Sequence, residues 1–327
     1  MTAWGDFYAT HVYPGVSAAL SWLASPFGFS LTEIVVVAAA VAAVWIIVRV
    51  ILRRKRWWRC LLAEAGLLLG VVAWLYLGWG FNYFRSSIYV RAETTPMPME
   101  EAEFHEFLSA FADQLNDNWC DVESIDPATV EQEIKAWYET VPPQFGLCRP
   151  RAWQHPKRML FNRLYSAVGV LGFIGPAFDE MHVNRDVSPL EYPFIFAHEY
   201  SHVLGVSSEA EANFWAFEAC RASHDAAIRY SAWYMLLSHT AYNIRSLLGE
   251  EAYAAWAETL IPEVFVDLEL SQIHWADLRW TWLSQVQHRF YDLFLKTNRI
   301  TAGTADYGQV LRLVMTFSQL HDHGEEE

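Results

Sequence analysis

Two long apolar runs joined by a short basic segment constrain this chain more than any other feature of its sequence. Leu31–Leu52 carries one acid near its start and one arginine near its end, and Cys60–Phe81 is a second run of similar length. About 20 apolar residues suffice for a helix to cross the hydrocarbon core of a bilayer. Residues 53–59 between the runs hold five basic side chains. The sequence therefore predicts a transmembrane hairpin over residues 31–81, with a pair of buried core helices as the alternative.

The basic segment also predicts an orientation. Cytoplasmic loops of membrane proteins carry an excess of Lys and Arg, so we expect residues 53–59 in the cytoplasm and both ends of the hairpin outside a bacterial cytoplasmic membrane. Residues 1–30 contain no Lys or Arg and thus lack the positive start of a signal peptide. We expect this segment to be retained as a short helix at the membrane surface, interrupted near Pro14 and Pro26.

Charge divides the chain at the same boundary. The first 91 residues hold 8 basic and 3 acidic side chains, whereas residues 92–327 hold 15 and 35. A strongly acidic outer domain disfavours nucleic acid and anionic lipid head groups as partners and is compatible with cationic or neutral peptides. A solvated acidic surface without a specific partner is the other interpretation.

Composition and periodicity divide the remainder of the chain. Residues 82–99, with two prolines near their end, read as an extended linker before a domain over residues 100–323 and an acidic tail over residues 324–327. Within the domain, Leu171–Asn184 favours short strands. Apolar spacing predicts helices over residues 101–119, 127–140, 224–248, 250–260, 276–296 and 306–320. Cys120 and Cys148 are either a disulfide or a pair of unlinked thiols.

The chemistry is concentrated in His198-Glu199-Tyr200-Ser201-His202, an HExxH pattern. Residues four apart lie on one face of a helix, so both imidazoles can face one metal ion. Glu199, one step around the helix, can then act as a general base on water at the metal. Two buried histidines that merely satisfy hydrogen bonds in the core are the alternative.

A catalytic zinc usually takes three protein ligands, so a third must follow the two histidines. Gly205 is placed to end the first helix, and Ser208 to Glu211 fits a capping box that opens a second one. In that box, Glu211 bonds back to the amide of the cap residue. Glu209 has no such role and stands four residues before Asn213 on the same face. We therefore predict Glu209 as the third ligand and Asn213 as a supporting hydrogen-bond partner.

These residues carry a resemblance to known families. Glu209-Ala210-Glu211-Ala212-Asn213 resembles the ExxAN element of gluzincins such as HtpX-type membrane proteases and ImmA/IrrE-type peptidases. More closely, the run His198–Ala219 is similar to bacterial membrane proteins catalogued as domain of unknown function 3810, as are Trp79–Tyr83 and Leu295–Asn298. In the gluzincins the first Glu of the element binds zinc and the final residue supports a histidine, which implies a Zn²⁺ site here.

Together these features predict a mainly α protein, in which a two-helix transmembrane hairpin precedes a zincin-like α+β metallopeptidase domain with a small sheet. The expected activity is hydrolysis of a peptide or protein substrate. By analogy with zincins, Glu180 and Asn184 would line the substrate cleft, and Tyr234 and His239 are possible oxyanion donors. The alternatives are a non-catalytic zincin-fold protein that binds a peptide or cell-envelope partner, and a hydrolase of another amide. The sequence leaves the oligomeric state open.

Overall fold

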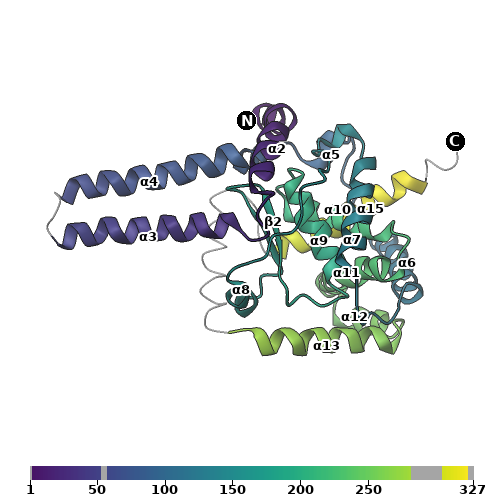
Figure 1. Ribbon diagram of the computed structural model, residues 1–327. Coiled ribbons are helices and arrows are strands. Elements are labelled where there is room, and N and C mark those ends of the chain that lie inside the picture. The colour runs from purple at the N-terminus through teal and green to yellow at the C-terminus, as the bar shows by residue number, and fades with distance from the viewer. Residues whose placement is uncertain (1, 53–56, 281–303, 323–327) are drawn as a thin grey trace.

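The computed structural model describes residues 2–52, 57–280 and 304–322. Three sequence features therefore lie wholly or partly outside the described residues: the basic loop, the helix expected over residues 276–296, and the acidic tail. Leu295–Asn298 lies outside them as well. The described chain is mainly helical with one small sheet, and a helical hairpin projects from one side of the domain (Figure 1).

The α-helices are α1 (Thr2–Phe7), α2 (Tyr13–Ala24), α3 (Leu31–Ile51), α4 (Trp57–Gly78), α5 (Ile88–Arg91), α6 (Glu101–Asp117), α7 (Pro127–Thr140), α8 (Asn162–Val168), α9 (Tyr192–Val203), α10 (Glu209–Arg221), α11 (Ala226–Leu247), α12 (Glu250–Ala257), α13 (Pro262–Leu278) and α15 (Thr304–Asp322). A π-helical turn, η1 (Tyr8–Val12), and two 3₁₀ turns, η2 (Gly80–Phe84) and η3 (Pro143–Phe145), complete the helical elements. The strands β1 (Gly172–Gly175) and β2 (Glu180–Val183) pair antiparallel, with Gly172 opposite Val183.

The hairpin consists of α3 and α4, which lie side by side (Figure 1). Both helices are long and apolar enough to cross a membrane by length and composition, with mean hydropathies of 2.6 and 2.0 over the candidate spans. Only 11% of the most apolar stretch of α3 and 6% of that of α4 is buried. Core helices would be mostly buried, so the alternative of two buried core helices does not agree with the structure.

The N-terminal segment does not form the separate surface helix that the sequence suggested. Its helix continues through Pro14, because a proline in the first turn of α2 loses no intrahelical hydrogen bond. Tyr13 is fully buried, and its hydroxyl donates to the carboxylate of Asp179 at 2.8 Å and to the carbonyl of Val203 at 2.7 Å. The segment is thus part of the domain core, and only the interruption after Ala24 agrees with the prediction.

The expected linker is only partly extended. Its first half forms η2 and α5, and Ile88 of α5 is buried in the core. Arg91 at the end of α5 pairs with the carboxylate of Glu211 on α10, with both side chains 9% exposed. The chain has no helix or strand from Ala92 to Glu100, so a linker exists but is about half as long as predicted.

The core of the domain forms where α9 and α10 pack against each other and against α7, α11 and α15. Helix α6 contributes Phe104, Phe111 and Leu115 to this core, and each is at most 1% exposed. Helix α13 was missed, because its apolar residues Val266 and Leu270 face solvent and its first-turn proline resembled a break. All four cysteines are free thiols, so Cys120 and Cys148 are not linked.

Candidate metal centre

The HExxH residues occupy the second half of α9, and that helix ends where the sequence predicted. Gly205 has a φ of +96°, a left-handed conformation that favours glycine, and its amide donates to the carbonyl of His202. Ten of the twelve residues of α9 are buried. The helix therefore holds His198 and His202 one turn apart within a packed environment.

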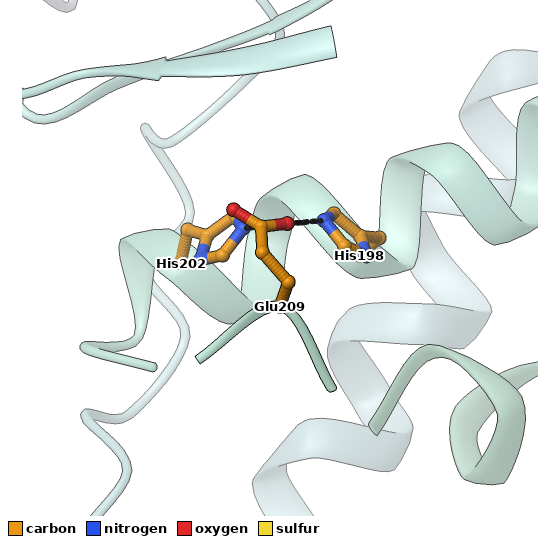
Figure 2. Close-up of side chains that lie close together, drawn as sticks. All are labelled: His198, His202 and Glu209. Carbon is orange, nitrogen blue, oxygen red and sulfur yellow. Dashed lines mark hydrogen bonds and ion pairs between the residues drawn. The ribbon is translucent and has the colours of Figure 1, made fainter. Parts of the chain in front are cut away.

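Helix α10 brings the predicted third ligand to the two histidines. Ser208 caps it by accepting from the amide of Glu211 at 3.4 Å, so Glu209 is its first residue. Oε2 of Glu209 lies 3.2 Å from Nε2 of His198 and 3.8 Å from Nε2 of His202. Figure 2 shows the carboxylate lying against both imidazoles, and the three donor atoms lie within 4.8 Å of one another.

The role predicted for Glu211 is only half correct. Its backbone amide takes part in the cap, but its carboxylate pairs with Arg91 instead of returning to the amide of the cap residue. An almost buried guanidinium offers a carboxylate a stronger partner than a neutral amide does. Glu211 consequently joins α10 to α5 and stays out of the ligand cluster.

Hydrogen bonds fix which nitrogen of each imidazole faces the cluster. Nδ1 of His198 lies 2.8 Å from Oδ1 of Asn213, as predicted, and Nδ1 of His202 lies 2.8 Å from the carbonyl oxygen of Val206. Both partners are acceptors, so each Nδ1 carries a hydrogen, and each Nε2 faces the cluster, where it has a lone pair when the imidazole is neutral. The two Nε2 atoms are 3.2 Å apart. Two imidazole nitrogens and a carboxylate at these distances can share a proton or hold a metal ion.

The contacts between Glu209 and the two histidines also shift the pKa values of His202 and Glu209. Burial alone would lower the pKa of His202, but hydrogen bonding to Glu209 and the charge of that carboxylate raise it to about 9. Burial opposes ionisation of Glu209, yet its hydrogen bonds to His198 and His202 hold its pKa well below the ordinary value. A proton and a metal ion would thus compete for the same Nε2 atoms and carboxylate oxygen. The donor set of two imidazoles and one carboxylate is the set that binds catalytic zinc.

Glu199 lies beside this cluster under the small sheet. The residue is 6% exposed, and its Oε2 has no hydrogen-bond partner among the described residues. Burial raises its pKa, while the two histidines oppose that rise. A Cβ atom added to Gly172 of β1 would lie 2.6 Å from Oε1 of Glu199. The glycine therefore makes room for the carboxylate, a role that the sequence analysis did not assign to it.

The segment after α4 supports the turn that joins the ligand helices, which sequence reasoning missed. Nε1 of Trp79 donates to the carbonyl of His202 at 2.9 Å, and a guanidinium nitrogen of Arg85 donates to that of Gly205 at 2.5 Å. The hydroxyl of Ser207 donates to the carbonyl of Asn82 at 2.9 Å. The end of a helix leaves carbonyl groups without intrahelical donors, and the side chains of Trp79 and Arg85 supply donors to the carbonyls at the end of α9 and in the turn after it. The available signal was a cluster of aromatic residues and one arginine directly after the apolar run.

Three residues are considered as donors of hydrogen bonds to an oxyanion at the cluster. Burial, and then the charge of His198, lower the pKa of His239 to about 4, so its imidazole is neutral. Burial and the charge of Glu209 raise the pKa of Tyr83, a residue absent from the predicted donors. The hydroxyl of Tyr234 instead donates to the carbonyl of Asp267 on α13 at 3.3 Å. Its prediction as an oxyanion donor is not supported.

The two residues predicted to line a substrate cleft have other roles. The carboxylate of Glu180 accepts from the amides of Leu31 and Thr32, at 3.1 and 2.8 Å, and thereby caps the first turn of α3. Asn184 is 1% exposed and bonds within the loop, donating to the carbonyl of Val170 at 2.8 Å. Both predictions are wrong, because these side chains are used to join distant parts of the chain.

Comparison with known proteins gives a family but no activity. The family described as protein of unknown function (DUF3810) matches residues 8–315, which includes the hairpin, both ligand helices and α13. No curated protein and no solved structure matches the chain. Because the match covers nearly the whole sequence, the chain belongs to the family described as protein of unknown function (DUF3810).

Proposed function

We propose that this protein is a membrane-anchored, zinc-dependent metallopeptidase with His198, His202 and Glu209 as ligands. The observation that carries the proposal is the convergence of two Nε2 lone pairs and one carboxylate beside a buried second carboxylate. The ligand set fits zinc, because both Nδ1 atoms are oriented by acceptors and the remaining donor atoms face one point. Zinc bound there would supply Lewis acidity.

The residues of the chain supply the proton transfers. Glu199 is one step around α9 from His198, so its carboxylate can take a proton from the attacking water and later give it to the leaving amine. The neutral imidazole of His239 and the phenol of Tyr83, whose pKa values are shifted by burial and by the charges of His198 and Glu209, are the proposed donors of hydrogen bonds to the oxygen that gains charge. The bulky side chain of Tyr200, next to Glu199 in the sequence, points away from the proposed reaction. It is fully buried, and its hydroxyl donates to Gln154 at 3.2 Å.

The membrane part of the proposal is that α3 and α4 span a bacterial cytoplasmic membrane. Helix α3 has 21 residues and α4 has 22, so each is about 30 Å long and matches the hydrocarbon thickness. With residues 53–59 in the cytoplasm, the domain lies outside the cell membrane and acts on peptides or proteins there. The acidic domain makes nucleic acid an unsuitable partner.

The test is metal content and hydrolysis by the full-length protein in detergent or nanodiscs. We expect about one zinc per chain, lost when His198 and His202 are both replaced by Ala. Glu199→Gln should retain the zinc and abolish hydrolysis of a peptide library, because the amide cannot accept the proton. Zinc binding without hydrolysis by the wild type would favour the non-catalytic peptide-binding protein instead. Absence of zinc under conditions that spare bound metal would refute the metal site.

A further inference from the structure

An exposed surface at the base of the hairpin combines apolar and basic side chains. It comprises Arg158, Leu160, Phe161, Arg163 and Leu164, here called the basal patch, at the start of α8 and just before it. The three apolar side chains are 42%, 43% and 48% exposed, and both arginines are exposed. Helix α8 lies on the side of the domain from which the hairpin projects (Figure 1). No role in the metal site has been given to these residues.

The basal patch is fastened to the first turn of α3. The buried carboxylate of Glu33 accepts from the amide of Leu160 at 2.6 Å and from that of Phe161 at 3.1 Å. The amide of Arg158 donates to the carbonyl of Gly28, and its carbonyl accepts from the amide of Ser30, both at 3.1 Å. These bonds use the backbone of the patch and leave its side chains pointing elsewhere.

This attachment sets the height of the patch relative to the hairpin. Glu33 is the third residue of α3, and the exposed apolar surface of that helix begins at the next residue, Ile34, which is 43% exposed. The rise of a helix is about 1.5 Å per residue, so Leu160 and Phe161 lie level with the start of that surface. If α3 spans the bilayer, the patch lies at the boundary between head groups and acyl chains.

Charge identifies which lipids suit this position. The outer part of the chain is acidic overall, and its net charge alone disfavours anionic head groups. Within the described part of the chain, neither Arg158 nor Arg163 has a side-chain hydrogen bond or ion pair, and both residues are exposed. Arginines beside exposed leucine and phenylalanine at an interface attract phosphate groups while the apolar side chains enter the acyl boundary.

We propose that the basal patch is a second membrane contact, which binds anionic phospholipid of the outer leaflet and seats the domain on the bilayer surface. Leu160, Phe161 and Leu164 would enter the boundary region, and Arg158 and Arg163 would bind head-group phosphates. The proposal rests on the membrane insertion of the hairpin and is independent of the metal chemistry. Its consequence is a fixed height and tilt of the metal centre above the membrane.

The test uses fluorescence quenching in the full-length chain. Cys120→Ser removes the one thiol that is not buried, and a single cysteine is then introduced by Phe161→Cys, Val36→Cys or Val266→Cys and labelled with an environment-sensitive dye. Val36 on α3 is 62% exposed, and Val266 on α13 is 54% exposed. The amide of Trp280 donates to the carbonyl of Ala167, so the C-terminal end of α13 is next to α8 and Val266 is about 20 Å further along.

In nanodiscs that contain lipid with a nitroxide near the head group, the dyes at positions 161 and 36 should lose most of their fluorescence and the dye at 266 should not. Quenching at 36 but not at 161 would overturn the patch and leave the hairpin intact. Quenching at neither would show that the hairpin itself is not inserted.

A second measurement tests the charge. Discs with equal amounts of phosphatidylglycerol and phosphatidylcholine are analysed by native mass spectrometry for lipid that stays bound. The double variant Arg158→Gln with Arg163→Gln should retain fewer phosphatidylglycerol molecules than the wild type, since the basic loop contributes equally to both proteins. Equal retention would refute the assigned role of the arginines.

Discussion

The hydrogen bond from Trp79 to the carbonyl of His202 predicts that the membrane hairpin tunes metal affinity. Trp79→Phe removes the indole N–H and keeps an aromatic ring at a position that is 5% exposed. The carbonyl of His202 keeps its bond from the amide of Gly205, so it is not left without a donor. The loss is therefore one ordinary hydrogen bond, worth about 1 kcal/mol. If that bond holds the second ligand in place, zinc should bind about fivefold more weakly.

A matched control, Trp74, lies five residues earlier, on α4. Nε1 of Trp74 donates to the carbonyl of Ala177 at 3.0 Å, so Trp74→Phe also removes one indole hydrogen bond between α4 and the domain. Its acceptor is not a ligand residue. Zinc affinity is measured by competition with a chelator, and stability by thermal unfolding of the metal-free protein. We expect both variants to lose some stability and only Trp79→Phe to lose affinity. Equal zinc affinities in the two variants would refute the positioning role of Trp79.

Three further predictions concern the site and its surroundings. Glu209→Ala should lose zinc, whereas Glu211→Ala should keep it. The second variant should lose about 3 kcal/mol of stability, because the nearly buried Arg91 loses its carboxylate partner. Loss of zinc in Glu211→Ala alone would show that Glu211, and not Glu209, is the ligand. Gly172→Ala should reduce hydrolysis with zinc still bound, since its methyl group would displace the carboxylate of Glu199; unchanged turnover would contradict the proposed space requirement. Burial raises the pKa of Asp179 to about 7, so the folded protein binds that proton more tightly than the unfolded chain does. The free energy of unfolding should fall by about 3 kcal/mol between pH 4 and pH 7 as Asp179 loses that proton. Asp179→Asn should remove this part of the slope when unfolding is measured as a function of pH, and an unaltered slope would contradict the prediction.

The sequence predicted those helix ends and shared helix faces that are determined by residues close together in the chain. The ends of α7 follow from Pro127 and from the prolines after Thr140, and the end of α9 follows from Gly205. Likewise, helical spacing alone predicts that Glu209 and Asn213 share a face, and both side chains contact His198. In each case the deciding residues lie within a few positions of one another.

The failures concern side chains whose partners are far away in sequence. Glu180 was placed in a cleft, yet its partners Leu31 and Thr32 are nearly 150 residues earlier. Tyr13 was expected at a membrane surface and instead bonds to Asp179 and Val203. Periodicity and capping rules describe neighbours along the chain, so they cannot reveal which polar group a buried carboxylate or phenol will meet.

The supports of the ligand turn have a consequence for any soluble form of this protein. The carbonyls of His202, Val203 and Gly205 accept from Trp79, Tyr13 and Arg85, which flank the hairpin on its two sides. A secreted or recombinant fragment that starts at Glu100 would retain every ligand and none of these three donors. Cleavage after Arg91 would thus release a domain whose turn between α9 and α10 lacks these three supports, and the proposed metal centre would be less rigid than in the full-length chain.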